Sequence, residues 1–352
     1  MQVLLLSIMA KCGVFTHVRD LAVHLKKKGF SPIIGFLYNS ATMSLFKVSR
    51  EDRTALEQTL VEVPYFYYDT LSSLVEKAKE LETDIVHAHS PIVLKHAAYI
   101  KYLLHIPFVI TLHGVIDWSR HYGTELKMAD KIIAVGPEVR ESCGNNFHNK
   151  VTIIYNGIDT EYFKPDENRT TNHPLRIIWI GRTSGSAARG AECLSLSLNK
   201  LKKSGIPFEA KIVGYPFGVN THGIEYCGWV HDPLPLLQWS DIAFGRGRSL
   251  REAMACGNAG FLLAEGYGGL VHSKWFENGN QPQLSGSLKH GYLKLDPTRI
   301  ARDILYFHKH RDHLESIRRD SRLISVTYFD IKKMVDEVIA VYEEAASPNY
   351  QP

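Results

Sequence analysis

Short apolar runs alternate with segments of helical periodicity along this chain, and this alternation constrains the fold more than any other feature. Between the first two runs, Val18, Leu21 and Leu25 recur at helical spacing, and Gly29 ends the pattern. Such an alternation is typical of β-α-β units with a parallel sheet. The strands predicted in this first series are residues 3–8, 31–38, 85–88, 108–112, 132–135 and 151–155.

The same pattern restarts after residues 164–174, a polar stretch that begins and ends near proline. The strands predicted in the second series are residues 177–180, 210–213, 225–229, 242–244 and 260–264. We therefore expect an α/β protein with two tandem Rossmann-like, doubly wound domains, 1–163 and 175–329, joined by the linker 164–174. In the terminal segment, 330–352, apolar residues at helical spacing predict an amphipathic helix followed by a tail.

The composition is that of an ordinary globular enzyme, with 45% hydrophobic and 22% charged residues among 352. The net charge of +4 permits an anionic substrate or an acidic membrane surface and gives no support to nucleic-acid binding. The five cysteines are scattered and never form a C-x-x-C pair, so neither a disulfide framework nor a zinc motif is indicated. We infer a reducing compartment, and we find no apolar run long enough to span a membrane.

Residues 240–257 combine an apolar run, a glycine-rich turn and a helix that opens around a single acid. In parallel-sheet domains this order presents backbone N–H groups and one carboxylate to a nucleotide or a sugar. The candidate contacts are Gly245, Arg246, Gly247, Arg248 and Glu252. A dinucleotide site is disfavoured, because neither glycine-rich turn of the chain forms a G-x-G-x-x-G motif after a strand.

Seven short motifs then occur in a distinctive order. They are Cys12-Gly13, the segment 84–90, Thr111-Leu-His113-Gly, the segment 129–135, Tyr155-Asn-Gly-Ile-Asp159, Ile180-Gly-Arg182 and Glu252-Ala-Met-Ala-Cys-Gly257. Together they resemble the retaining glycosyltransferases of the GT-B fold, family 4 type, over nearly the full length. The resemblance implies two domains facing a central cleft, with the C-terminal helix crossing back to the N-terminal domain. It also implies a nucleotide diphosphate sugar as donor, and no metal or other cofactor.

The resemblance assigns the reacting centre to His113, Arg182 and Arg189. His113 ends a predicted strand, and the family's histidine at this place lies beside the donor sugar. Arg182 and Arg189 would lie on either side of a loop between a strand and a helix and hold the donor diphosphate, whose negative charge grows as the glycosidic bond breaks. The implied mechanism is a front-face displacement in which the leaving phosphate helps to deprotonate the incoming hydroxyl, so no protein nucleophile is needed.

Further residues are assigned to donor and acceptor binding. Glu252 would accept hydrogen bonds from the ribose hydroxyls. The other donor-binding candidates are Gly13, Gly181, Gly245, Arg246, Gly247 and Arg248. Lys11 and His17 are candidates for the acceptor side. Residues 265–269 are predicted to be a loop, either an ordinary turn or a closure over the nucleotide.

Two positions depart from the family's pattern. Phe244 occupies the place of the first of two acids, and Cys12 that of the first of two glycines. We expect Phe244 to pack in the core, and the 245–247 turn to replace the lost sugar contact with backbone N–H groups. Two function classes stay open: a retaining glycosyltransferase, and a non-catalytic nucleotide-sugar-binding protein or nucleotide-sugar epimerase. We favour the transferase, because the arginine pair, His113 and Glu252 are all present.

Nothing in the sequence names the acceptor, which we expect to be a glycan, a lipid or a small molecule. In the N-terminal half, the basic run 26–28, the aromatic run 65–68 and Trp118 are the surface candidates for binding it. We expect a cytoplasmic protein without a transmembrane segment, for which peripheral contact with the inner face of the membrane is an option.

Overall fold

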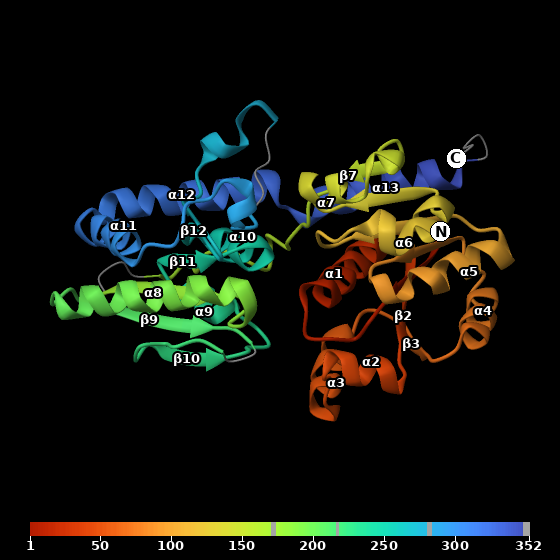
Figure 1. The fold of residues 1–352 in the computed structure, drawn as a ribbon, viewed down its shortest axis with the longest axis horizontal. Coiled ribbons are helices and arrows are strands. Elements are labelled where there is room, and N and C mark those ends of the chain that lie inside the picture. Colours follow the sequence, from red (N-terminus) through yellow and green to blue (C-terminus); the bar gives the residue numbers. More distant parts are fainter. Residues whose placement is uncertain (170–173, 216–217, 280–283, 348–352) are drawn as a thin grey trace. The chain divides into compact units, whose positions relative to one another are not determined.

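The chain folds into two compact units, each with helices packed on a mostly parallel sheet (Figure 1). The computed structural model describes residues 1–169, 174–215, 218–279 and 284–347. Unit 1 comprises Met1–Gly157 and Ile331–Pro352, and unit 2 comprises Ile158–Asp330. The predicted pair of tandem Rossmann-like folds is confirmed, while a cleft shared by the two units stays a prediction.

The chain enters unit 2 earlier than the sequence predicts. Residues 158–169 already belong to unit 2, although 164–174 was expected to be a separate linker. Arg169 is fixed there, because its Nη1 atom donates a hydrogen bond of 2.9 Å to the carbonyl of Gln238. The polar composition of this segment therefore reflects attachment to the surface of unit 2, and residues 170–173 lie outside the described residues.

Unit 1 is built on a seven-stranded parallel sheet with the order β3-β2-β1-β4-β5-β6-β7. Its strands are β1 (Gln2–Ser7), β2 (Ser31–Leu37), β3 (Tyr65–Tyr68), β4 (Ile85–Ala88), β5 (Phe108–Leu112), β6 (Lys131–Ala134) and β7 (Val151–Ile153). All six strands predicted for this half are present. The sequence does not predict β3, because four successive aromatic residues give neither an apolar run nor a regular alternation; pairing with β2 makes them a strand.

Helices flank both faces of this sheet. They are α1 (Gly13–Lys27), α2 (Ser40–Phe46), α3 (Arg50–Glu57), η1 (Gln58–Leu60), α4 (Leu71–Glu80), η2 (Pro91–Val93), α5 (Leu94–Leu104), α6 (Trp118–Met128), α7 (Pro137–Ser142), η3 (Asn145–Phe147) and α13 (Ile331–Ala346). Trp118, a predicted surface candidate, is instead buried in the core.

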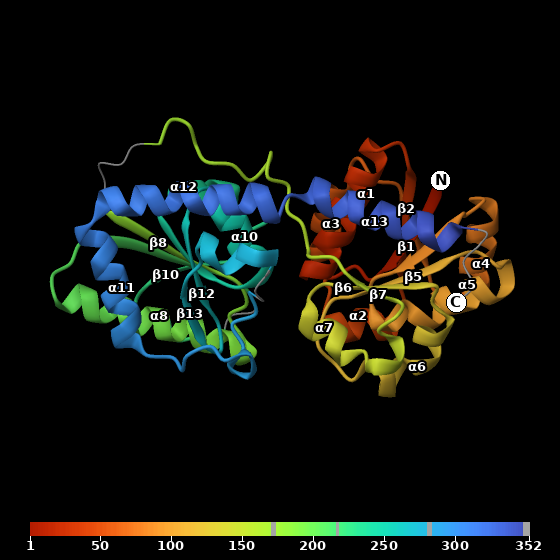
Figure 2. The ribbon, with the colours of Figure 1, turned by 90° about the horizontal axis from the view of Figure 1, so that it is seen from above.

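The C-terminal helix α13 returns to unit 1, as predicted, and lies against α1 (Figure 2). Its buried stripe includes Ile331, Val335 and Tyr342, which pack in one apolar cluster with Leu5 of β1. Burying a large apolar side chain contributes about 1.5–3 kcal/mol. The helix is therefore an integral part of the core of unit 1.

Unit 2 has a six-stranded sheet with the order β10-β9-β8-β11-β12-β13. Its strands are β8 (Leu175–Ile180), β9 (Phe208–Val213), β10 (Glu225–Gly228), β11 (Ile242–Gly245), β12 (Ala259–Leu263) and β13 (Tyr267–Leu270). β13 runs antiparallel to β12, so the prediction that residues 265–269 form a loop is wrong for residues 267–269, while residues 265 and 266 do lie between the two strands. Gly268 and Gly269 are strand residues here, and Gly269 accommodates the irregular pairing with a φ of +77°.

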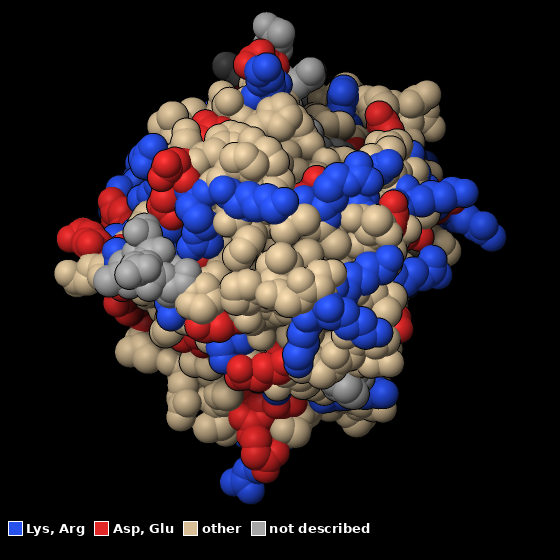
Figure 3. Space-filling model, turned by 90° about the vertical axis from the view of Figure 1, so that its left-hand side faces the viewer, with Lys and Arg blue, Asp and Glu red and all other residues tan. Residues whose placement is uncertain are grey.

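The helices of unit 2 also cover both faces of their sheet. They are α8 (Gly185–Lys203), α9 (Leu234–Trp239), α10 (Gly247–Ala255), η4 (Ser273–Gly279), η5 (Leu288–His290), α11 (Pro297–Lys309) and α12 (Arg311–Tyr328). Alternate residues of β8 enter two separate apolar clusters, with Trp179 in one and Ile178 in the other. At the end of the unit that Figure 3 shows, basic side chains are interspersed with acidic ones, so this face is not a field of one sign.

Candidate active site

Each unit brings its candidate residues to the carboxyl edge of its sheet, where doubly wound folds bind ligands. In unit 1, His89 directly follows β4 and His113 directly follows β5, while His17 lies in the second turn of α1. β1 pairs with β4, and β4 pairs with β5, both in parallel. This pairing brings the three histidine-bearing segments next to one another.

The side chains of His17, His89 and His113 form a compact cluster. The ring centroids are 5.4 Å apart for His17 and His89, 4.7 Å for His17 and His113, and 5.6 Å for His89 and His113. The Nδ1 atom of His89 and the Nε2 atom of His113 are hydrogen-bonded at 3.3 Å. The structure thus unites His17, predicted for the acceptor side, with His113, predicted for the reacting centre.

His87 connects this cluster to the C-terminal helix. Its Nδ1 atom is hydrogen-bonded to the Tyr342 hydroxyl and its Nε2 atom to the Thr111 hydroxyl, both at 2.7 Å. Its ring lies beside that of His89, with 3.9 Å between the centroids. The sequence gives no local signal for Tyr342 as a partner, because 255 positions separate it from His87.

Burial keeps these imidazoles neutral. It is the largest cause that lowers the pKa of His87, His89 and His113 well below the usual value, and repulsion from neighbouring imidazoles adds to it. A neutral imidazole donates one hydrogen bond and accepts another. His113 would therefore meet a ligand as a hydrogen-bonding group and not as a cation.

The loop between β1 and α1 holds the remaining candidates of unit 1. The Lys11 ammonium forms an ion pair with the Asp52 carboxylate of α3, which partly balances its charge. Gly13 is the first residue of α1, and a Cβ atom there would meet nothing within 4 Å. The space on the Cβ side of Gly13 is therefore open, so the backbone at this helix start can be approached there.

In unit 2, glycines lie where the strands end, and close packing of the backbone accounts for them. A Cβ on Gly245 would lie 2.5 Å from the carbonyl oxygen of Ile180. A Cβ on Gly214, after β9, would lie 2.0 Å from the carbonyl oxygen of Gly181. Gly181 and Gly245 thus lie at the predicted edge of the sheet. At Gly245 the neighbouring backbone leaves no room for a side chain.

Arg182 and Arg246 bring positive charge to this edge of unit 2. Arg182 is exposed just beyond β8, and Arg246 lies between β11 and α10. β8 and β11 are neighbours in the sheet. Burial and then the charge of Arg182 lower the pKa of Arg246, and the Glu265 carboxylate acts in the opposite direction. The sequence analysis predicts both arginines as site residues, but it does not predict that Glu265 partly balances the charge of Arg246.

The sequence predicts that Arg189 lies at the end of a loop, but the structure places it in a helix. α8 begins at Gly185, so Arg189 is an exposed residue in the second turn of this helix. The loop prediction is wrong because Ala187 and Ala188, both buried, are strong helix formers.

Glu252 lies in the second turn of α10 and is only 7% exposed. The Nε atom of Arg248, one turn earlier, donates a hydrogen bond of 2.6 Å to its Oε1 atom. Two predicted donor contacts thus form an ion pair, which holds the carboxylate in one orientation. A held carboxylate is the acceptor that a pair of ribose hydroxyls requires.

The turn before α10 agrees with the prediction at one position and differs at another. Phe244 is fully buried and stacks on Phe261 with 5.0 Å between the ring centroids, so the expectation that it packs in the core is confirmed. The N–H of Gly247, however, donates a hydrogen bond of 2.7 Å to the Leu284 carbonyl. The expectation that this N–H binds a sugar is corrected, because the protein already uses it.

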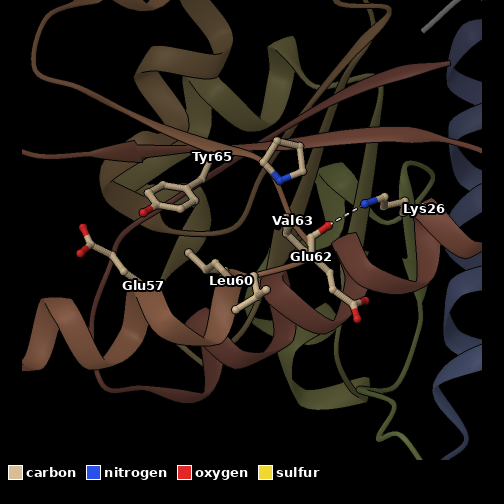
Figure 4. A pocket seen from close by; sticks show the side chains of 8 residues that line it. Lys26, Glu57, Leu60, Glu62, Val63 and Tyr65 are labelled. Atoms are coloured by element: carbon tan, nitrogen blue, oxygen red, sulfur yellow. Dashed lines mark hydrogen bonds between the residues drawn. The ribbon is translucent and has the colours of Figure 1, made fainter.

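A hollow of unit 1 lies away from these candidates (Figure 4). It has a volume of about 690 Å³ and is lined by Lys26, Glu57, Leu60, Val61, Glu62, Val63, Pro64 and Tyr65. Tyr65 begins β3, and Lys26 lies near the end of α1, so the hollow is at the amino edge of the sheet. The Lys26 ammonium donates a hydrogen bond of 2.9 Å to the Glu62 carbonyl. The hollow is therefore separate from the histidine cluster at the carboxyl edge.

Residues 12–162 match the model of Glycosyltransferase Family 4. The whole chain is similar to a glycosyltransferase from Rickettsia africae ESF-5, with a TM-score of 0.72 and 18% identity over 99% of both chains. It is also similar to Alr3699/HepE of Anabaena in complex with UDP and glucose, with a TM-score of 0.68 and 16% identity over 97% of this chain and 98% of that chain. The predicted resemblance to family 4 is confirmed for residues 12–162, and the predicted GT-B fold is confirmed for the whole chain.

The family match covers most of unit 1 and the first five residues of unit 2, and the similarity to the GT-B fold extends over the whole chain. The fold also occurs in a Listeria monocytogenes protein assigned as a UDP-N-acetylglucosamine 2-epimerase, with a TM-score of 0.58 and 11% identity over 97% of this chain and 96% of that chain. No curated protein matches the sequence. Within the described part of the chain, every helix is too short or too polar to cross a membrane.

Proposed function

We propose that this GT-B protein is a retaining glycosyltransferase, which moves a sugar from a nucleotide diphosphate to an acceptor hydroxyl. The observation that carries the proposal is the placement of Arg182, Arg246 and the Arg248–Glu252 pair at one sheet edge of unit 2. Guanidinium groups suit a diphosphate, and a held carboxylate suits a ribose. Because Alr3699/HepE of Anabaena binds UDP, a UDP-sugar is the first donor to test.

In the proposed reaction, the bond between sugar C1 and the phosphate oxygen breaks, and the acceptor oxygen forms a bond to C1 on the same face. The acceptor proton passes to a phosphate oxygen of the leaving group. Negative charge on the diphosphate grows during this step, so Arg182, with Arg189 and Arg246, would stabilise the transition state more than the ground state.

His113 has a separate proposed role, as a hydrogen-bonding contact of the donor sugar. Its bond to His89 orients the ring, and burial, the main cause of its lowered pKa, keeps it neutral. A neutral imidazole does not repel the positive charge that develops on the sugar during glycosyl transfer. A histidine cation at this place would oppose the reaction.

One observation favours the second candidate, a nucleotide-sugar-binding protein without transfer, or an epimerase. The side chain of Phe244 is packed against Phe261 in the core, so this position contributes no acid to the donor sugar. In the proposed transferase, the backbone N–H groups that follow Gly247 in the first turn of α10 take over this contact, since that helix begins without a side-chain cap.

The test measures binding first and chemistry second. We expect a nucleoside diphosphate or its sugar to raise the melting temperature of the chain, because a ligand of the native state stabilises it by mass action. We then expect slow hydrolysis or transfer of the sugar with retained anomeric configuration, followed by proton NMR. Binding without transfer or hydrolysis across a broad donor and acceptor panel would favour the binding protein, and release of an epimerised sugar would favour the epimerase.

A further inference from the structure

We propose that His17, His89 and His113 bind one divalent transition-metal ion of the zinc class. The three side chains come from α1, the end of β4 and the end of β5, and one nitrogen of each lies within 4.8 Å of the others. The proposal goes beyond the transferase activity and does not depend on it.

The spacing of the rings fits a single ion. With zinc–nitrogen bonds of about 2.05 Å and tetrahedral angles, two ligating nitrogens lie about 3.3 Å apart. The His89 Nδ1 and His113 Nε2 atoms are 3.3 Å apart. The same geometry places the centroids of two ligating imidazoles about 5.2 Å apart. The three centroid distances in the cluster are 4.7, 5.4 and 5.6 Å, on both sides of that value.

The donor set selects the class of metal. Three imidazoles without a carboxylate or a thiolate suit zinc, nickel, copper and cobalt, and they do not suit magnesium or calcium, which prefer oxygen ligands. Three protein ligands also leave one position of a tetrahedral ion for water or another small ligand. His113 is partly exposed, whereas His17 and His89 are buried, so the ion would be reached from the His113 side.

Neighbouring contacts favour three ligands over four. Both ring nitrogens of His87 are already hydrogen-bonded, to Tyr342 and to Thr111, so His87 is not available as a ligand. Its fixed ring lies 3.9 Å from that of His89 and limits how far His89 can move. An ion held by His89 Nδ1 and His113 Nε2 would replace the one hydrogen bond between these two atoms. The Nε2 atom of His89 is buried and has no hydrogen-bond partner among the described residues, so no bond at that atom opposes a small rotation of the ring.

A bound ion would use the His113 Nε2 atom, which in the proposed transferase is hydrogen-bonded to His89 and so orients the ring toward the sugar. The ion would therefore replace the bond that orients the ring of His113 for the donor. We expect the metal to act as an inhibitor of sugar binding and not as a cofactor.

The decisive experiment is a titration of the untagged, metal-free full chain with Co²⁺, followed by displacement with Zn²⁺. We expect one Co²⁺ per chain and the visible absorption bands of a tetrahedral site. His113→Gln and His17→Gln should each weaken binding by more than about 100-fold, beyond what the loss of an outer hydrogen-bond partner costs. The control is His121→Gln, which changes an exposed histidine of α6 and should leave the titration unchanged.

A second measurement guards against variants that fail to fold. Zn²⁺ should raise the melting temperature of the wild-type chain and of His121→Gln, but not that of His113→Gln with an unchanged circular dichroism spectrum. His113 is partly exposed, so this variant should fold even if His17→Gln does not. Unchanged affinity in folded His113→Gln, or no saturable binding to the folded wild-type chain, would overturn the proposal.

Discussion

Unit 1 and unit 2 carry their candidate residues at the same edge of the same kind of sheet, but with different chemistry. At the edge of unit 1, histidines are gathered and kept neutral by burial, which lowers the pKa of His89 and His113. At the edge of unit 2, arginines keep their charge: Arg182 is exposed, and Arg248 is paired with Glu252. The fold fixes where a ligand can bind, and the side chains decide what kind of ligand it is.

The difference shows how ionisation limits burial. An imidazole can lose its proton near neutral pH, so burying it neutral costs little. A guanidinium group cannot be deprotonated in a protein, so it has to keep water or a carboxylate beside it. The edge of unit 1 should therefore respond to pH, and the edge of unit 2 to the charge of its ligand.

The largest expected effect is the loss of stability of unit 1 in acid. The pKa of His87, His89 and His113 lies well below the usual value in the folded chain, mainly because burial desolvates these rings, although His113 as a residue keeps part of its surface exposed. In the unfolded chain they titrate near pH 6.5 and bind up to three more protons below it. The stability that these neutral histidines confer is fully present above about pH 6.5. As the pH is lowered below this value, the free energy of unfolding falls by up to about 4 kcal/mol per pH unit.

Hydrogen exchange of the metal-free chain at pH 7 and in mild acid measures this difference. Amides of β4 and β5 should lose protection as the pH falls, while those of β8 and β11 should change less. An equal loss of protection in both sheets would show that the buried histidines do not make unit 1 more sensitive to acid than unit 2.

The second effect concerns turnover. Arg182→Ala should lower turnover by about 10²–10³-fold, the usual loss when a group that stabilises transition-state charge is removed, with little change in the affinity for the bare nucleoside. Arg189→Ala should act in the same direction by a smaller factor, because Arg189 is an exposed residue of α8. Lys202→Ala, near the other end of α8, is the control. Full turnover in either arginine variant removes that residue from the phosphate site.

A third, smaller effect is expected for nucleotide binding. Glu252→Ala should weaken it by about 1.5–3 kcal/mol, the scale of a hydrogen bond to a charged group. Since Arg248 donates to the Glu252 carboxylate, the loss in a double variant should be less than the sum of the two single losses. Calorimetry measures each affinity. Wild-type affinity in folded Glu252→Ala would refute the ribose contact.

The smallest effect is expected from Tyr342→Phe. This change removes the hydroxyl that is hydrogen-bonded to His87 and should lower the free energy of unfolding of unit 1 by about 1–2 kcal/mol. Tyr328→Phe, in α12 of unit 2, is the matched control. Denaturant unfolding followed by probes in each unit compares the two, and a larger effect of the control would contradict the assigned contact.

The sequence predicts the repeated architecture well, because a parallel sheet buries its strands and gives continuous apolar runs such as β1 and β12. It fails for the two edge strands that were missed. β3 consists of aromatic residues, and β13 contains the glycines of an apparent turn; tertiary pairing makes both of them strands.

The sequence alone predicts the candidate site in two places. His113 is found because it directly follows a strand, where parallel sheets bind ligands, and Glu252 is found because it follows a glycine-rich turn at a helix start. Arg182 is assigned only through the family resemblance. The register within a helix is less clear from sequence, as Arg189 shows. Contacts between distant segments, such as that of Tyr342 with His87, have no local signature at all.

The return of α13 to unit 1 has a consequence for how the chain is made. Residues 1–157 leave the ribosome long before the helix that completes their core, because the whole of unit 2 is synthesised in between. At about 5–20 residues per second, the delay is on the order of ten seconds or more. During that time the apolar surface that α13 covers in the finished protein lacks its native partner. We expect this surface to be the place where a chaperone engages the nascent chain, and ribosome-bound chains that end before Ile331 to depend on such help.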